Sequence, residues 1–219
     1  MGTSYNPPIV TDGLVFCVDA ANQRSYPKSG TTWSDLAGSN DANLVNGPAY
    51  VSTETGGVSF DGANDLCNIS SNALNPSDGT ICIWLKSGVD NKDIYNSHSG
   101  SWNQNTLWVE SSTLRFRISD GTAAPGDVTY SGPVFDGIPK FICCQWTNGG
   151  ERSLWVDSIK VGSLSSTRLF VPSSTWEIGY KSWQVNRFLG NIYSIHSYNR
   201  SLAADEVRQN YEATVGRFS

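Results

Sequence analysis

Apolar and polar residues alternate at period two through many short segments of this chain, and that spacing is typical of β-strands. The clearest case is GTICIWLKSG, residues 79–88. There Ile81, Ile83 and Leu85 share one face, while Cys82 and Trp84 share the other. Because both faces are apolar, we predict a central strand that is covered on both sides.

The same alternation predicts a series of further strands and hairpins, at residues 13–20, 57–62, 65–70, 106–119, 140–147, 152–162, 175–180 and 187–199. In 106–119 we expect Leu114, Phe116 and Ile118 to point inward and Arg115 and Arg117 to point outward. The turn at 148–150, Asn-Gly-Gly, favours a hairpin. Many short strands without strand–helix alternation predict an antiparallel β-sandwich or a barrel.

One segment changes to helical spacing near the C-terminus. Residues 202–212 place Ala204, Val207 and Tyr211 on one stripe, which predicts a short amphipathic helix. Ser201 is the predicted N-cap, and Gly216 lies just beyond the expected end.

Composition narrows the class of protein. The 219 residues carry a net charge of −5 and no basic run, which argues against nucleic-acid binding. No stretch approaches the roughly 20 apolar residues that span a bilayer, and the first residues lack the pattern of a secretory signal. The five cysteines, an odd number without zinc spacing, are expected to be buried reduced thiols.

Several of these segments together resemble a known family. GGVSFDGANDLCNI, GTICIWLKSG, LRFRISDG, SLWVDSIKVG, WEIGY and FLGNIYSIHSYNRSLAADEV follow the order found in laminin G-like jelly rolls of the concanavalin A-like lectin/glucanase superfamily. This resemblance covers about residues 13–212 and implies a two-sheet jelly-roll sandwich. Residues 5–36 also look like virion-associated proteins of tailed bacteriophages that carry this domain.

Pro7-Pro8 predicts an extended arm at residues 1–12, because two prolines block a helix, and the resemblance implies a laminin G-like domain at 13–219. Its first functional implication is a non-enzymatic virion component, a capsid decoration or tail-associated module that is assembled in the host cytoplasm. Tyr5, Pro7 and Pro8 would then anchor it to other virion proteins, for example by strand addition. The oligomeric state stays open, although trimers are common among such spikes.

The alternative function is a carbohydrate-binding adhesin that recognises host surface glycans. Trp102 and Trp183 lie in polar loops, where an aromatic ring could stack on a sugar. Tyr180, Asn186 and Arg187 are the polar or aromatic neighbours of Trp183. A covered sheet edge or a subunit contact would use the same residues.

Glycoside hydrolysis is a third and disfavoured function, because no strand carries the paired carboxylates that this reaction needs. Glu110 stands alone at a strand end. His98 and His196 lack triad partners in the sequence, so His98 is predicted to be an exposed loop residue and His196 a structural one. We therefore predict a protein that is not an enzyme.

Calcium is the usual cofactor of the family, held in part by an Asp after a Gly-x-Ile triplet. Here Tyr193 follows Gly190-Asn191-Ile192, and a phenol cannot replace a hard carboxylate ligand. The other oxygen donors in question are Asp19, Asp35, Asn40 and Asp41. Since such residues more often bond to their own backbone in turns, no metal or other cofactor is predicted.

Overall fold

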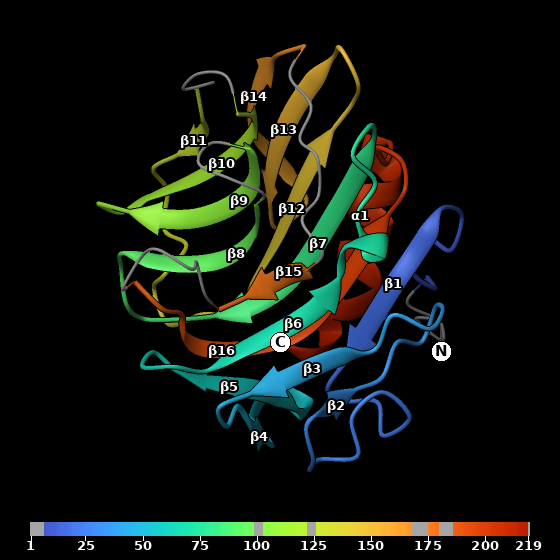
Figure 1. Ribbon diagram of the computed structural model, residues 1–219, viewed down its shortest axis with the longest axis vertical. Coiled ribbons are helices and arrows are strands. Elements are labelled where there is room, and N and C mark those ends of the chain that lie inside the picture. Colours follow the sequence, from blue (N-terminus) through green and yellow to red (C-terminus); the bar gives the residue numbers. More distant parts are fainter. Residues whose placement is uncertain (1–6, 99–102, 122–125, 168–174, 180–185, 219) are drawn as a thin grey trace, which may run out of the picture.

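The computed structural model describes residues 7–98, 103–121, 126–167, 175–179 and 186–218. Within these ranges the strands form two antiparallel sheets of eight strands each, packed face to face as a jelly-roll sandwich (Figure 1). Sheet A runs β14 (Ile159–Ser165), β13 (Glu151–Val156), β12 (Lys140–Trp146), β7 (Gly79–Lys86), β16 (Leu189–Tyr198), β5 (Gly57–Asp61) and β4 (Ala49–Val51), with β1 (Leu14–Asp19) also paired to β16. Sheet B runs β11 (Val128–Tyr130), β10 (Thr113–Asp120), β9 (Asn103–Glu110), β8 (Lys92–His98), β15 (Thr175–Ile178), β6 (Leu66–Ser70), β3 (Ala42–Val45) and β2 (Thr32–Trp33). The sandwich confirms the fold class expected from the period-two segments.

Strand β7 is buried on both faces, as predicted. Its residues Ile81, Ile83 and Leu85 belong to the core between the sheets, whereas Cys82 and Trp84 belong to a second apolar cluster on the back of sheet A. The alternation of a strand sends successive side chains to opposite faces, so one apolar segment serves two layers.

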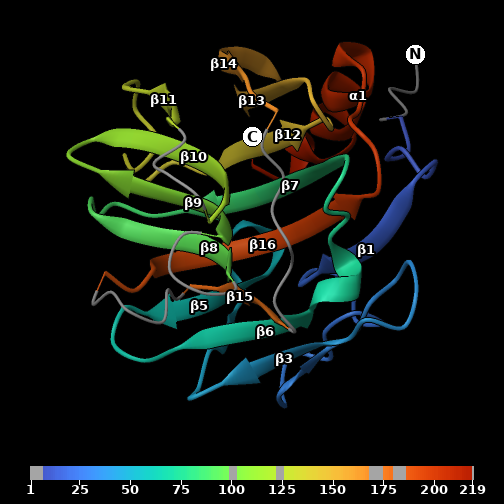
Figure 2. The ribbon, with the colours of Figure 1, turned by 45° about the horizontal axis from the view of Figure 1, so that its top comes forward.

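Helix α1 (Ala204–Thr214) covers the back of sheet A, on the side away from sheet B (Figure 2). Val207 is fully buried there, and the Trp84 ring stacks on Phe218 with centroids 4.2 Å apart. The Trp84 indole N–H also donates to the Thr214 hydroxyl at 2.7 Å. The cluster therefore closes over the otherwise exposed apolar side of β7.

The predicted start of this helix is wrong by two residues. Ser201 is not the N-cap: that position is Ala203, whose backbone N–H donates to the Glu206 carboxylate at 2.8 Å. Glu206 also accepts two bonds from the Arg200 guanidinium. The carboxylate at the third helical position thus satisfies the N–H of the N-cap residue, which is the half of a capping box that needs no N-cap side chain. Ala204 is exposed, so the predicted stripe is shorter at its start.

The described part of the arm, residues 7–12, lies against α1. Val10 is buried; its N–H donates to Asn210 Oδ1 at 2.8 Å, and its carbonyl accepts from the Tyr198 hydroxyl at 3.0 Å. The Pro8 carbonyl accepts from Gln209 Nε2 at 2.7 Å. This end of the arm is therefore bonded to the chain's own helix and closing strand.

Three short 3-10 turns complete the described structure: η1 (Thr53–Thr55), η2 (Ser71–Ala73) and η3 (Val215–Arg217). Across the described ranges, none of the helices combines the length and apolarity that a membrane span requires.

Candidate functional site

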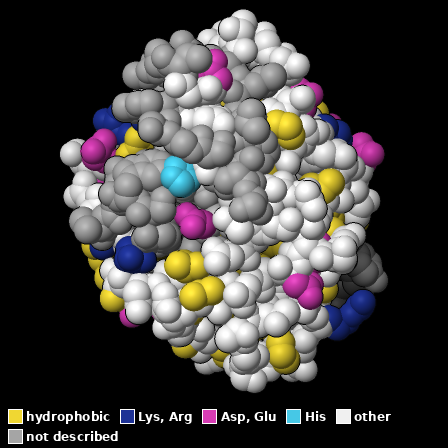
Figure 3. Space-filling model, in the orientation of Figure 1, with side chains coloured by type: hydrophobic (Ala, Val, Ile, Leu, Met, Phe, Trp, Pro, Cys, Tyr) yellow, Lys and Arg dark blue, Asp and Glu magenta, His cyan; other side chains and the backbone are white. Residues whose placement is uncertain are grey.

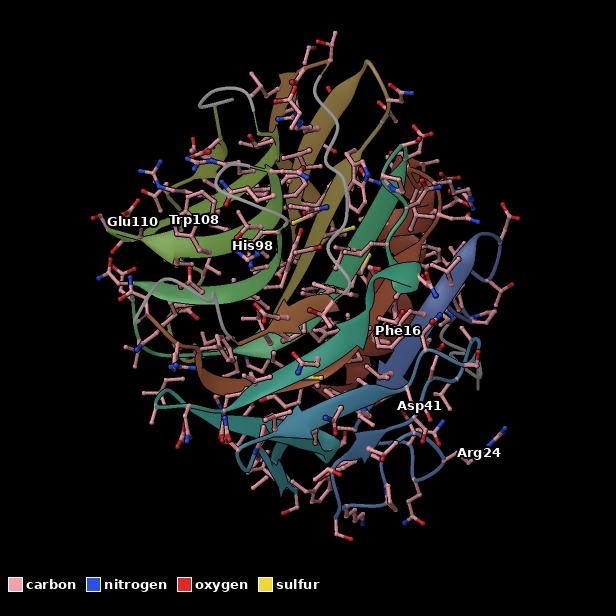
Figure 4. All side chains as sticks on the ribbon, in the orientation of Figure 1. Phe16, Arg24, Asp41, His98, Trp108 and Glu110 are labelled. Atoms are coloured by element: carbon pink, nitrogen blue, oxygen red, sulfur yellow. The ribbon has the colours of Figure 1, made fainter. Side chains whose placement is uncertain are left out.

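Strands β8, β9 and β15 present a polar set of side chains on the face of sheet B that points away from sheet A, which we call the outer face. The register pairs Asn96 with both Thr106 and Glu177, and His98 with Gln104. Alternate residues on the same strands, Tyr95, Leu107 and Ile178, point into the core. Figure 4 labels His98 and Trp108, which lie on the neighbouring strands β8 and β9. Neighbouring strands thus gather amide, carboxyl, imidazole and hydroxyl groups on one surface.

Two side-chain amides on the outer face are buried without hydrogen-bond partners. Asn96 is fully buried and neither of its amide atoms makes a hydrogen bond. Gln104 is 3% exposed and its Oε1 is also unbonded. An unsatisfied buried polar group costs about 1–3 kcal/mol, so such groups point to a water or a ligand that completes them.

Glu177 stands directly beside Asn96. Burial raises the pKa of this carboxyl above its ordinary value, and the nearby Asn96 amide acts in the opposite direction although its geometry falls outside that of a hydrogen bond. The Asn96 amide carries both a donor and an acceptor, and the Glu177 carboxyl oxygens accept. The Asn96–Glu177 pair therefore offers both donors and acceptors to a ligand.

An arginine covers Trp108 on the outer face. The Arg117 guanidinium lies 5.0 Å from the centre of the Trp108 ring and makes two bonds to Asp127, at 2.6 and 3.1 Å. Arg115 approaches the same carboxylate at 3.4 Å. Because Trp108 is only 8% exposed, the flat guanidinium, rather than the indole, is the surface offered to solvent here.

The predicted ligand or interface residues are only partly placed. Trp102, Tyr180 and Trp183 lie outside the described residues. Asn186 and Arg187 lie in the segment that leads into β16, where the Asn186 carbonyl accepts from the backbone N–H of Asp93 at 2.8 Å. This bond brings the segment alongside β8, at the edge of the outer face.

The predicted anchor is likewise only partly placed. Tyr5 lies outside the described residues. Pro7 is half-buried, and Pro8 is exposed with its carbonyl bonded to α1. Its role as an attachment arm stays a prediction.

The two histidines have different surroundings. His98 is half-buried, and it lies at the end of strand β8 rather than in the predicted exposed loop. His196 is 3% exposed on the back of sheet A, where it pairs with Cys17 and Cys82 on the neighbouring strands. Burial lowers the pKa of His196 to about 4, so it is neutral at physiological pH. Its Nδ1 makes no hydrogen bond to the residues that the structure describes.

The oxygen donors considered for calcium do not form a metal cage. Asp35 Oδ1 accepts from the backbone N–H groups of Cys17 and Ala37, and Oδ2 from that of Asn40. Asp41 in turn accepts from the Asp35 N–H. Among the residues that the structure describes, no group of three or more His, Cys, Asp or Glu side chains is placed to hold a metal ion.

Asp19 and Tyr193, the other two positions considered for calcium, are also occupied by contacts within the protein. Asp19 accepts from the Ala21 N–H and from the Arg217 guanidinium. The Tyr193 hydroxyl donates to Glu54 at 2.9 Å, and the ring is buried under Phe218. These residues therefore do not fit the family's calcium site, and we derive no chemistry through a metal.

Sequence reasoning missed the residues that define the outer face. The sequence pattern places Asn96 and Gln104 in loops, whereas the structure places them on β8 and β9. The pattern places Glu177 and Trp108 on strands without assigning them to a face. The only local signal is the run of four polar residues at the start of Asn103–Glu110, which does not alternate and so does not identify a face. The burial of its amides depends on neighbouring strands and could not be read locally.

Comparison with known proteins places the chain among lectin-like folds. Residues 60–208 match the family model described as "Concanavalin A-like lectin/glucanases superfamily". No curated protein matches the sequence.

Three solved structures illustrate the likeness in fold. The binding domain of botulinum neurotoxin DC in complex with SialylT has a TM-score of 0.75 at 10% identity, over 93% of this chain and 52% of that one. The binding domain of Paraclostridial mosquitocidal protein 1 gives 0.73 at 16%, over 92% and 52%. The Trypanosoma rangeli sialidase in complex with the inhibitor DANA gives 0.70 at 15%, over 99% and 36%. The chain thus spans about half the length of the toxin binding domains, and these low identities establish the fold alone.

Proposed function

The chain belongs to the concanavalin A-like lectin/glucanase superfamily, and from that premise we propose that it is a carbohydrate-binding domain whose binding surface is the outer face of sheet B. The observation that carries the proposal is a set of buried amide atoms on this face that make no hydrogen bond: both amide atoms of Asn96 and the Oε1 of Gln104. Sugar hydroxyls both donate and accept, so they are suited to complete amide groups of this kind.

The surroundings of the amides support the same class of ligand. The visible face in Figure 3 is mostly uncharged, with a few scattered Lys, Arg, Asp and Glu side chains outside the grey areas. Arg117 is held flat over Trp108 and is already neutralised by Asp127. A surface of neutral polar groups with a fixed planar cation favours a polyhydroxylated ligand over a nucleic acid or an apolar one.

Related folds add support from their printed descriptions. The botulinum neurotoxin DC domain was solved with SialylT, and that of botulinum neurotoxin serotype D was solved with N-acetylneuraminic acid. These ligands belong to those proteins. They support a saccharide as the class of ligand here, without naming the sugar.

The experiment is a glycan array probed with the full chain, followed by titration calorimetry with the best ligand. We expect Asn96→Ala to weaken binding by about tenfold or more, because a ligand hydroxyl would lose two bonds to the buried amide. Asn148→Ala is the matched control: it removes the same amide from the exposed β12–β13 turn of sheet A. Equal affinity of Asn96→Ala and wild type would refute the outer face as the binding surface.

The predicted virion role stays a separate prediction. The matched structures are toxin binding domains and a sialidase, so they lend no support to capsid or tail attachment or to a trimer. The absence of enzymatic activity also stays a prediction.

A further inference from the structure

A small pocket opens at the end of the sandwich where three connections meet. It encloses about 180 Å³ between the β7–β8 connection, the β9–β10 turn and the β11–β12 connection, and its walls include Asp90, Val109, Ser112, Pro133, Phe135 and Asp136. Val109 pairs with Lys92 at one end of the β8–β9 ladder, whereas Gln104 pairs with His98 at the other. The pocket is therefore distinct from the amide cluster of the outer face.

The pocket has an apolar floor and an aromatic wall. Val109 and Val134 are buried, at 3% and 4% exposed. Phe135 is half-buried and meets Phe188 edge to face, with ring centroids 6.1 Å apart. Since Phe188 is itself fully buried, it fixes the Phe135 ring in place. The wall is therefore a rigid apolar surface against which one ring of a ligand can lie.

Two carboxylates stand at the mouth with acceptor capacity to spare. Asp90 Oδ2 accepts from the Ser112 N–H and hydroxyl, whereas Oδ1 accepts only from Asn91 N–H. Asp136 accepts from Ile138 N–H through Oδ1 and faces Lys140 Nζ at 3.2 Å through Oδ2. Each carboxylate oxygen can accept two hydrogen bonds, so three acceptor positions remain for ligand hydroxyls.

The rim is held in an unusual backbone conformation. Asn91, Ser111 and Ser112 have φ values of 57°, 51° and 57°, a region that residues other than glycine rarely adopt. Asn91 Oδ1 accepts from the Ser111 N–H at 3.0 Å, and Asp90 binds Ser112. Strained residues that are pinned by side chains occur often at ligand clamps, because the strain fixes groups before the ligand arrives.

From this arrangement we infer that the pocket is a second sugar site that takes one neutral pyranose ring, with the ring's apolar face on Phe135 and adjacent hydroxyls on Asp90 and Asp136. This inference rests on the proposed carbohydrate-binding function. The volume lies below the roughly 300–1,000 Å³ of most ligand pockets, so one ring fits and an oligosaccharide would extend outside.

Charge selects among sugars. Lys140 offsets the charge of Asp136, while Asp90 has no ion-pair partner among the described residues. The pocket therefore carries net negative charge and disfavours acidic sugars such as a sialic acid, because like charges repel at short range.

The test is saturation-transfer NMR on the full chain with methyl glycosides of glucose, galactose, mannose and N-acetylglucosamine, and with sialic acid as the acidic probe. We expect transfer to at least one neutral glycoside, strongest at the protons of one ring face, and no transfer to sialic acid that depends on Asp136. Asp136→Ala should weaken this binding by about tenfold to a hundredfold, as expected for the loss of a hydroxyl–carboxylate bond. Asp136→Asn, which keeps an acceptor for the Ile138 N–H, should cause a smaller loss. Thermal melting checks that each variant is folded.

Asn96→Ala separates this site from the outer face, and Asn148→Ala serves again as the control. Loss of transfer in Asp136→Ala with transfer retained in Asn96→Ala supports the pocket. Loss in Asn96→Ala alone would overturn the pocket while leaving the proposed function in place. Equal transfer in Asp136→Ala and wild type, or strong transfer to sialic acid that Asp136→Ala abolishes, would also overturn it. Absence of transfer to every sugar, together with a blank glycan array, would reject both.

Discussion

His196 makes the stability of this protein sensitive to mild acid. The imidazole is 3% exposed on the back of sheet A, and burial lowers its pKa to about 4, with Arg217 acting in the same direction and Asp19 against it. In the unfolded chain the pKa returns to about 6.5. Between these two values the unfolded state binds a proton that the folded state does not, so the free energy of unfolding falls as the pH falls.

The size of the effect follows from the difference between the two pKa values. Each unit of difference in pKa changes the free energy of unfolding by about 1.36 kcal/mol. The free energy of unfolding therefore falls by about 3 kcal/mol in total between pH values above 6.5 and pH values below about 4. At pH 5.0 about 2 kcal/mol of that has already been lost. For a domain of this size, 2 kcal/mol lowers the melting temperature by about 4–8 °C.

The assay is urea unfolding at pH 7.5 and 5.0, followed by tryptophan fluorescence. We expect wild type to lose about 2 kcal/mol more between these pH values than His196→Gln, whatever the absolute stability of the variant. His98→Gln is the matched control, because it removes the chain's other histidine from a half-buried position and should keep the loss. An equal pH dependence of wild type and His196→Gln would refute the reasoning.

Three further predictions concern other buried groups. Trp84→Ala should lower the free energy of unfolding in urea by about 3–5 kcal/mol, because it leaves a cavity under α1 and removes the hydrogen bond to Thr214. A decrease of less than about 1 kcal/mol would contradict this account of the packing. Tyr198→Phe should cost about 1–3 kcal/mol and speed hydrogen exchange in residues 7–12, because the Val10 carbonyl loses its donor; unchanged exchange there would mean that another contact holds the arm. All five thiols should resist Ellman's reagent in the native protein and react in urea, because each is buried, and burial raises the pKa of Cys17 to about 12; rapid reaction of any native thiol would contradict this.

Local periodicity determined which residues of a strand share a face. The prediction that Leu114, Phe116 and Ile118 point inward is confirmed, as is the apolar character of both faces of β7. These results depend only on the alternation of side chains along an extended chain, so short-range pattern was sufficient. The family resemblance supplied the sandwich, and the structure and the family match both confirm it.

Pairing between strands lay beyond the sequence pattern, because it depends on contacts across long separations. Strand β16 pairs with β7 along one edge, while on the other its first half pairs with β5 and its second with β1. The same reason applies to the helix start, where the Glu206 carboxylate accepts from the Ala203 N–H. It applies also to the pKa of His196, which depends on burial and on the charges of Asp19 and Arg217, near opposite ends of the chain.

The candidate sites show most clearly what the sequence determines and what only the tertiary structure determines. The amide side chains of Asn96 and Gln104 are visible in the sequence, but only the folded chain shows that both are buried. The small pocket at the end of the sandwich brings together Asp90 and Asp136, which are 46 residues apart in the sequence. No local sequence pattern extends over that separation. The sequence determines which chemical groups the side chains carry. The positions of those groups relative to one another depend on how the strands pair and how the two sheets pack.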